Sequence, residues 1–320
     1  MPPVFFFACH TARRYEYNEV NRLLRLVLCM KQCEIKTFGI LGGDKRQLFL
    51  ADSLIKDGRS VILGGFDTLR SFGSIAIADI RTALEYSDAL ILPVPCVRTD
   101  GSLNAPFASV GIYFDSDELE IMKKKPVFTS MKERLVRAYP DLKGARLYDY
   151  AARDDFAILN AVPTAEGAAE CAMSAFEGTL AGARCLVTGY GRIGKVLSRL
   201  LHSLGAKVTV SARSDTDRAY IQAFGYGFVN TTELREVRGF DVVFNTVPFL
   251  LFDETLLKNT DRDTLLIDLA SLPGGVDFDA ASALRIDAQR ALSLPGKCAP
   301  KTAGEIIKTT VFRIIEEGNR

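Results

Sequence analysis

A glycine-rich turn between an apolar run and a helical pattern constrains the fold of this chain more than any other segment. The run ARCLVT at 183–188 breaks into Gly189-x-Gly191-x-x-Gly194, and helical spacing follows in KVLSRLLHSLG. In such a strand-turn-helix unit the first glycine makes the tight turn, the second leaves room for a pyrophosphate, and the third lets the helix pack on the strand. The segment predicts a dinucleotide site with the phosphates at the helix N-terminus.

The end of the next predicted strand indicates which dinucleotide is bound. The strand AKVTVSAR ends in Ala212-Arg213-Ser214, where an NAD site would place an acidic residue for the ribose 2′-hydroxyl. An arginine at this position favours a 2′-phosphate. We therefore expect NADP as the cofactor, although Arg213 could also be an ordinary solvated surface residue.

Composition narrows the class of protein. The chain has 320 residues, a net charge of +1 and 25% charged residues, which suits about two domains and gives no long-range field to attract nucleic acid. No apolar run reaches the roughly 18 residues of a membrane span. The seven cysteines are scattered and odd in number, which is typical of reduced thiols. We expect a cytoplasmic protein that binds neither nucleic acid nor membrane.

Histidine is nearly absent, with only His10 and His202 in the whole chain. A zinc site is disfavoured, and we expect no bound metal. A dehydrogenase mechanism with a histidine base is disfavoured too, because His202 falls within the helix after the glycine turn, where a surface role is favoured.

Residues 1–36 differ from the rest of the chain. They begin with the apolar patch VFFFAC, which lacks the positive segment of a secretory signal, and arginines mixed with acids follow. The first convincing strand starts at Lys36. We interpret 1–36 as an extension and Met30 as a possible true start, which a native peptide spanning Arg14 to Met30 would exclude.

From Thr37 onward, predicted strands and helices alternate, and a second such series begins at Ala183. The pattern predicts an α/β fold of two Rossmann-like, doubly wound domains with a cleft between them. We place an N-terminal substrate domain at 37–160, a cofactor domain at 161–298, and a C-terminal helix at 299–320 that crosses back to the first domain.

Two helix starts are predicted from capping patterns. Thr164, after Pro163, is the expected N-cap of a connecting helix at 164–178. Thr302-Ala303-Gly304-Glu305 has the form of a capping box, with Ile307, Val311 and Ile314 on one face behind it.

Several short motifs occur in one order along the chain. They are Gly42-Gly43-Asp44-x-Arg46-Gln47, Arg153-Asp154-Asp155, Pro163-Thr164-Ala165-Glu166-Gly167, the Gly189 turn with Ala212-Arg213-Ser214, Asn245-Thr246-Val247-Pro248, Asp268-Leu269-Ala270-Ser271-x-Pro273-Gly274-Gly275-x-Asp277-Phe278, and Leu294-Pro295-Gly296-x-x-Ala299-Pro300-Lys301-Thr302-Ala303-Gly304. In this order, from about Thr37 to Ile315, the chain resembles the family of dipicolinate synthase A subunits. It departs from the expected pattern at Leu272, where a basic residue is usual.

The resemblance implies a reaction and a set of partners. A protein of this family would oxidise dihydrodipicolinate with NADP to pyridine-2,6-dicarboxylate during sporulation, together with a flavoprotein-like B subunit. We also expect a homo-oligomer. Forming an aromatic ring is strongly downhill, so the protein has mainly to position the substrate and accept one proton.

The resemblance also suggests which residues form the site. A substrate with two carboxylates needs cations, hydroxyls and backbone amides, for which the candidates are Gly43, Arg46, Gln47, Thr164, Lys297 and Lys301. The candidates for the proton acceptor are Asp44 and Glu166. The expected cofactor contacts are Gly189, Tyr190, Gly191, Arg192, Ile193, Gly194, Ala212, Arg213, Ser214, Asn245, Thr246, Val247, Pro248, Ala270 and Ser271.

Plainer interpretations stay open at several of these positions. Gly42 and Gly43 could be only a turn, Glu166 could complement a helix dipole, and Lys301 could be a surface charge. For the whole chain, the alternatives are a cofactor-binding scaffold subunit or a Rossmann dehydrogenase acting on another small 2-oxo or amino acid.

Overall fold

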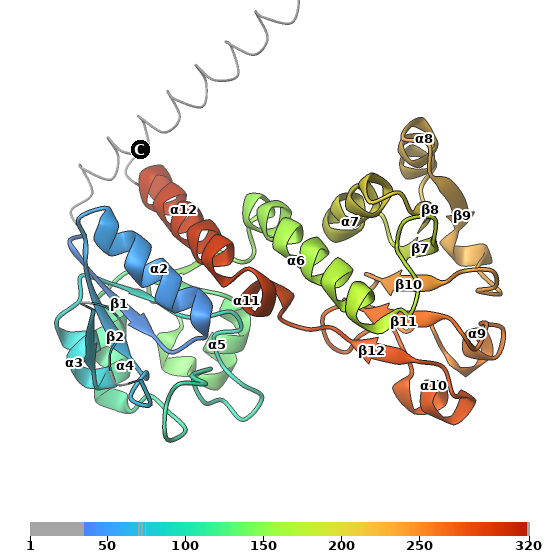
Figure 1. Cartoon of the computed structure of the whole chain (residues 1–320). Helices are drawn as coiled ribbons and strands as arrows, with labels where there is room; N and C mark the ends of the chain where they lie inside the picture. Colours follow the sequence, from blue (N-terminus) through green and yellow to red (C-terminus); the bar gives the residue numbers. More distant parts are fainter. Residues whose placement is uncertain (1–34, 70, 72, 74, 319–320) are drawn as a thin grey trace, which may run out of the picture. The chain divides into compact units, whose positions relative to one another are not determined.

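The computed structural model describes residues 35–69, 71, 73 and 75–318 (Figure 1). The chain divides into two compact units: unit 1 contains the residues up to Arg153 and those from Gly304 onward, and unit 2 is Asp154–Ala303. The sequence patterns predicted these divisions at 160 and 298. The hypotheses on His10, on the Met30 start and on all but the last two residues of the 1–36 extension lie outside the described residues.

Unit 1 is built on a six-stranded, all-parallel sheet of order β3-β2-β1-β4-β5-β6. Its strands are β1 (Thr37–Leu41), β2 (Ser60–Gly64), β3 (Ala76–Ala78), β4 (Ala89–Ile91), β5 (Val127–Thr129) and β6 (Leu147–Asp149). Its helices are α2 (Lys45–Lys56), α3 (Ile80–Glu85), α4 (Ser116–Lys123), α5 (Lys132–Ala138) and the 3₁₀ turn η1 (Pro140–Leu142). The central strands β1 and β4 are almost fully buried, because helices cover both faces of a parallel sheet.

Unit 2 repeats this topology with a sheet of order β12-β11-β10-β7-β8-β9, again parallel throughout. Its strands are β7 (Arg184–Thr188), β8 (Lys207–Ala212), β9 (Gly227–Asn230), β10 (Val242–Asn245), β11 (Leu265–Asp268) and β12 (Ala288–Arg290). Its helices are α6 (Asp154–Ala175), α7 (Arg192–Ser203), α8 (Asp215–Ala223), η2 (Thr231–Glu233), α9 (Glu254–Lys258), α10 (Phe278–Leu284) and α11 (Leu294–Cys298). The predicted fold class, two doubly wound α/β sheets, is confirmed.

Helix α6 differs from the predicted connecting helix. It begins at Asp154 and runs through Pro163, which lies inside it, so Thr164 is not an N-cap. The Thr164 hydroxyl instead donates to the Asn160 carbonyl at 2.7 Å. Proline was a misleading sign because it is favoured in a first helical turn. After the proline, Ala165, Ala168 and Ala172 are fully buried in the core of unit 2, and Ala161 before it is 1% exposed.

The C-terminal helix α12 (Pro300–Gly318) lies within the predicted range 299–320, but it starts two residues before the predicted cap at Thr302. Thr302 lies within the helix rather than at a cap, and Glu305 pairs with Lys308 at 3.0 Å. The capping-box prediction is therefore wrong, because Pro300 already begins the helix and leaves Thr302 in its first turn.

From Gly304 onward, α12 packs on unit 1 beside α2 (Figure 1). A Cβ on Gly304 would lie 2.6 Å from the Arg46 carbonyl oxygen, so the two helices touch through backbone at this point. Further along, Lys308 pairs with Asp57 at 2.8 Å, and the Phe312 ring meets the Phe38 ring at 6.0 Å between centroids. The last segment of the chain thus completes the core of the first unit.

Candidate functional site

The glycine turn of unit 2 has three distinct local geometries. Gly189 follows β7 with φ +91°, a conformation that side chains disfavour. A Cβ on Gly194 would lie 2.0 Å from the Gly189 carbonyl oxygen, whereas a Cβ on Gly191 would meet no atom within 4 Å. The first glycine makes the turn, the third allows close packing of α7, and the second leaves open space. This is the arrangement that a pyrophosphate needs at a helix N-terminus.

The other expected cofactor residues follow neighbouring strands of the same sheet. Since all the strands are parallel, their carboxyl ends lie along one edge, and the order of strands reverses between β7 and β10. The Gly189 turn follows β7, Ala212 ends β8 with Arg213-Ser214 after it, and two further segments follow β10 and β11: Thr246-Val247-Pro248 and Ala270-Ser271. The fold therefore gathers these predicted residues along the edge where such sheets bind ligands.

At the end of β8, Ala212 is buried and Arg213 is exposed. In the part of the chain that the structure describes, Arg213 has no ion pair. Ser214 is the N-cap of α8 and accepts a hydrogen bond from the Asp217 amide at 3.1 Å. Arg213 thus presents an uncompensated charge beside a helix start.

A buried polar network lies beneath this edge. The Thr188 hydroxyl donates to Asn245 Oδ1 at 2.7 Å, and Asn245 Nδ2 donates to Asp268 Oδ1 at 2.7 Å. The Gly275 amide donates to Asp268 Oδ2 at 3.1 Å, and all three side chains are fully buried. Asn245 therefore ties three strand ends together, and its side chain is turned away from solvent.

Asp268 heads one of the sequence motifs but was not among the predicted site residues. A Cβ on Gly274 would lie 2.7 Å from its carboxylate, so the loop after β11 closes tightly over it. A carboxylate directly after the apolar run LLI was the available signal, because a buried charge demands partners. Asp268 and Asn245 hold the loops that would contact a cofactor.

The glycine turn after β1 in unit 1 corresponds to the Gly189 turn of unit 2. Hydrogen bonds to other residues of unit 1 hold its conformation. Gly42 and Gly43 have φ values of +65° and +103°, and the Gly43 amide donates to the Asn104 carbonyl at 2.8 Å. Asp44 and Gln47 form a capping box at the start of α2. The Gln47 side chain is fully buried, and its Nε2 has no hydrogen-bond partner among the described residues.

Arg46 and Asp44 form a two-point ion pair. Arg46 Nε lies 2.9 Å from Asp44 Oδ1, and Arg46 Nη2 lies 2.9 Å from Oδ2. Nη2 also donates to the Val94 carbonyl at 2.6 Å, and Arg46 is only 5% exposed. The pair joins the turn after β1 to the loop after β4, so both side chains already have structural partners.

The remaining predicted site residues lie on helices of unit 2. Thr164 is buried in α6, while Glu166 is exposed near the middle of that helix. Lys297 on α11 and Lys301 at the start of α12 are exposed. Gly43, Asp44, Arg46 and Gln47 belong to unit 1.

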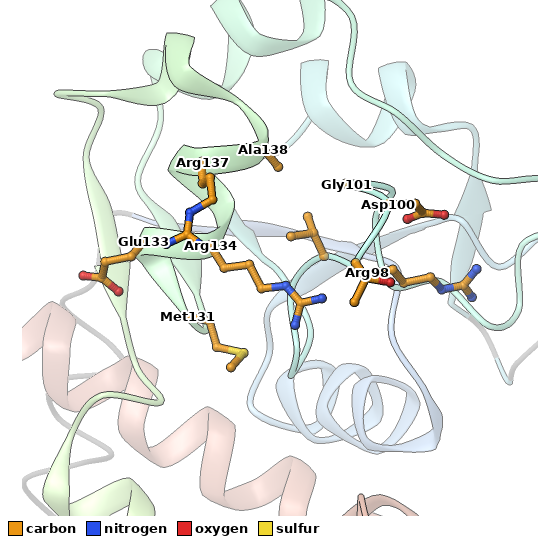
Figure 2. Close-up of a pocket in the computed structure, with 10 residues that line it drawn as sticks. Arg98, Asp100, Gly101, Met131, Glu133, Arg134, Arg137 and Ala138 are labelled. Carbon is orange, nitrogen blue, oxygen red and sulfur yellow. The ribbon is translucent and has the colours of Figure 1, made fainter. Parts of the chain in front are cut away.

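Unit 1 contains a pocket of about 840 Å³ that was not predicted (Figure 2). Segment 97–101, which follows β4, forms one wall, and Met131 with helix α5 forms the other. Arg98, Arg134 and Arg137 line it. We call it the arginine pocket. Arg134 and Arg137 are three residues apart on α5, Arg98 is distant from them in the sequence, and none of the three lies in a recognisable motif.

The described residues contain no cluster of histidine, cysteine, aspartate or glutamate side chains suited to a metal ion. In the same part of the chain, no helix is long and apolar enough to cross a membrane.

Two sheets with the strand order of the dinucleotide-binding fold, one carrying the glycine turn, define a protein of the two-unit Rossmann-like class. Two solved structures show the same fold at low sequence identity. A transhydrogenase from Sinorhizobium meliloti has a TM-score of 0.57 at 13% identity, and the match covers 87% of this chain and 92% of the transhydrogenase. D-lactate dehydrogenase from Escherichia coli has a TM-score of 0.55 at 15% identity, and the match covers 88% of this chain and 97% of the dehydrogenase.

Comparisons at higher identity identify the family. A family model described as the N-terminal domain of the dipicolinate synthase A subunit matches residues 37–151. The A subunit of dipicolinate synthase from Bacillus subtilis (strain 168) is 33% identical over 285 residues, which are 87% of this chain and 95% of the relative. The crystal structure of the Bacillus halodurans protein of the same name has a TM-score of 0.78 at 33% identity and covers 88% of this chain and 97% of its own. The chain belongs to the family of dipicolinate synthase A subunits, as its ordered motifs predicted.

Proposed function

We propose that this chain is the oxidoreductase subunit of a dipicolinate synthase that oxidises dihydrodipicolinate to pyridine-2,6-dicarboxylate with NADP during sporulation. The observation that carries the proposal is the open space at Gly191, set between the tight turn at Gly189 and the close contact at Gly194. Family membership supports the substrate class. The proposed partner is a flavoprotein-like second subunit, and the proposed assembly contains more than one copy of this chain.

The residues of unit 2 fit the proposed cofactor. The amides at the start of α7 would hold the pyrophosphate, and the exposed Arg213 would meet the ribose 2′-phosphate. A bound NADP would supply the hydride acceptor for the substrate ring, and the ring would then have only one proton to lose to become aromatic. The buried Asn245 and Asp268 would act indirectly, by holding the loops after β10 and β11 in place.

In unit 1, the proposed substrate contacts are Gly43 and Gln47, because the buried Gln47 Nε2 is a donor without a partner in the described structure. Arg46 would support the turn through Asp44. In unit 2, Thr164 sits buried in α6 and is proposed as a positioning residue. Lys297 and Lys301 are exposed cations that remain proposed carboxylate contacts.

The cofactor assignment is tested by the substitution Arg213→Glu. We expect the ratio of NAD to NADP affinity to rise at least about 30-fold, because the new carboxylate repels a 2′-phosphate and accepts from a 2′-hydroxyl. Isothermal titration with each dinucleotide measures both affinities. Arg218→Glu, on the exposed face of α8, is the charge-matched control. An unchanged ratio in the Arg213 variant would overturn the NADP assignment.

The proton acceptor is tested by Glu166→Gln. Glu166 is the candidate whose carboxylate is exposed, whereas Asp44 is held by Arg46. If Glu166 takes the proton, kcat falls at least about 100-fold and the acidic limb of its pH profile is lost, with NADP affinity unchanged. The assay supplies enzymatically made dihydrodipicolinate and follows NADPH and pyridine absorbance. Full activity of the variant would exclude Glu166.

The same assay decides between the proposed function and a scaffold role. The purified chain is measured alone and with its partner subunit. Turnover by the chain alone supports an enzyme and excludes a scaffold. No turnover in either case counts against the proposed reaction and favours a dehydrogenase of another small 2-oxo or amino acid.

A further inference from the structure

The arginine pocket lies at the same edge of the unit 1 sheet as the Gly42 turn. Segment 97–101 comes after β4, and Met131 comes two residues after the end of β5, so both walls stand at the carboxyl ends of parallel strands. Ligands of open α/β sheets bind beyond these ends. A volume of about 840 Å³ is within the range of small-molecule sites.

The walls of the arginine pocket are held in place by hydrogen bonds. The Arg98 amide donates to the Ser102 carbonyl at 2.8 Å, and the Tyr139 hydroxyl donates to the Gly101 carbonyl at 2.9 Å. On the other side, the Arg134 amide donates to the Met131 carbonyl at 2.8 Å. The pocket therefore exists without a ligand to shape it, which lowers the entropic cost of binding.

The charges that line the pocket are not compensated by ion pairs. In the described part of the chain, none of the side chains of Arg98, Arg134 and Arg137 has a hydrogen-bond or ion-pair partner. Hydrogen bonds from the Ser102 hydroxyl and amide, and to a smaller extent the charge of Arg98, hold the pKa of the Asp100 carboxyl below the usual range, although Asp100 forms no ion pair with Arg98. Glu133 points away from Arg134 (Figure 2).

Arg134 is the central cation of this group. Its side chain extends from α5 towards segment 97–101 (Figure 2) and is half-buried. Arg137 follows it on α5, whereas the Arg98 guanidinium points away from Arg134, on the side of Asp100 (Figure 2). Both Arg98 and Arg137 are exposed, so their side chains can change rotamer at little cost. In contrast, Arg46 is already committed to Asp44 and Val94.

A planar guanidinium matches the two oxygens of a carboxylate, and several guanidinium groups suit a ligand with two. We propose that the arginine pocket is the carboxylate-binding site of unit 1 for a small cyclic dicarboxylate, with Arg134 as the principal contact and Arg98 and Arg137 beside it. This proposal rests on the proposed function for the identity of the dicarboxylate. It moves the principal carboxylate contact from Arg46 to Arg134.

The test is isothermal titration of the full chain with pyridine-2,6-dicarboxylate. In Arg134→Ala we expect Kd to rise at least tenfold, and in Arg134→Lys about threefold, because a lysine keeps the charge and loses the two-point geometry. Pyridine-2-carboxylate should bind the unaltered chain about tenfold more weakly than the dicarboxylate. The charge-matched control is Arg262→Ala, an exposed site in unit 2, which should bind like the unaltered chain.

The dependence of Kd on salt and on pH provides a second test of the proposal. Kd should rise with sodium chloride and stay constant from about pH 6.5 to 9, because carboxylates and arginines keep their charge over that range. Inorganic phosphate is the competing probe. Tighter binding of phosphate than of the dicarboxylate, equal binding by Arg134→Ala and the unaltered chain, or no binding of the dicarboxylate would each overturn the proposal.

The turnover assay separates this proposal from the proposed function. If the chain oxidises dihydrodipicolinate and Arg134→Ala does so with unchanged KM, the pocket assignment fails and the reaction stands. If no form of the chain turns over but dicarboxylate binding depends on Arg134, the pocket stands and the reaction fails. NADP affinity and the Tm should be the same in the variant, and a fall in either would overturn the assignment by showing that Arg134 acts through the fold.

Discussion

At the scale of single residues, Gly191 and Gly194 lie three positions apart in one turn and have opposite surroundings. An added Cβ at Gly191 meets nothing within 4 Å, and its φ of −77° suits any residue. An added Cβ at Gly194 would overlap the Gly189 carbonyl oxygen. The space beside Gly191 is therefore free for the proposed cofactor, while Gly194 is required by the packing of the turn.

This contrast predicts different results for two alanine variants. Gly191→Ala should keep its Tm and lose at least tenfold in NADP affinity, because the methyl group enters the space intended for the pyrophosphate. Gly194→Ala should lose about 3 kcal/mol of unfolding free energy, because the backbone must shift to avoid the clash. Urea unfolding and isothermal titration measure the two effects. A Gly191 variant that binds NADP normally would contradict the proposed cofactor position.

In unit 1, too, residues of the same type have different surroundings. Asp44 and Arg46 were selected for their chemistry, yet they are bound to each other. Arg134, which no motif contains, has a free guanidinium in the described structure and faces a pocket. The sequence predicted Arg46 as a carboxylate contact of unit 1, whereas the carboxylate contact proposed from the structure is Arg134.

At the scale of elements, the short helix α11 places Cys298 against α6. A Cβ on Gly167 would lie 2.8 Å from the Cys298 Sγ, so the thiol packs on a helix glycine. Burial first, and then the neighbouring Glu170, raise the pKa of the Cys298 thiol to about 11. The thiol is therefore protonated at neutral pH and is a poor nucleophile there.

Cys298 should accordingly react slowly with iodoacetamide at pH 8, and its rate should rise about tenfold per pH unit up to about pH 11. The ordinary thiol pKa is 9.0, so above that pH the unfolded chain loses a proton that the folded chain keeps. This contribution to stability is fully present below about pH 9 and is lost as the pH rises towards 11.

Peptide mass spectrometry after timed alkylation gives the rate, and thermal unfolding of Cys298→Ser is the comparison for stability. The serine variant should show a shallower loss of Tm between about pH 9 and 11. Rapid alkylation of Cys298 at pH 8 would show that the thiol is not shielded in the folded chain.

At the scale of the whole molecule, the last helix stabilises the unit that the start of the chain builds. Phe312 is 2% exposed and packs on Phe38 in β1. Phe312→Ala should cost about 3–5 kcal/mol, because a large buried ring is lost and a cavity remains. The effect should be confined to unit 1.

Hydrogen exchange read by mass spectrometry tests this prediction. Peptides from β1 and α2 should lose protection in the Phe312 variant, while those from β7 and α7 keep theirs and NADP affinity is unchanged. Phe224→Ala, at a residue that is 56% exposed, is the control and should change little. Equal loss of protection in both units would contradict an effect confined to unit 1.

The sequence by itself determined the alternation of strands and helices, the parallel class of the sheets and the glycine turn, because each depends on residues close together in the chain. Only the tertiary structure decided that α6 continues through Pro163, that Asp44 holds Arg46, that Asp268 is buried with Asn245, and that Arg98 and Arg134 face one pocket. The physical reason is that burial and the pairing of charges are set by residues distant in sequence, which local patterns do not record.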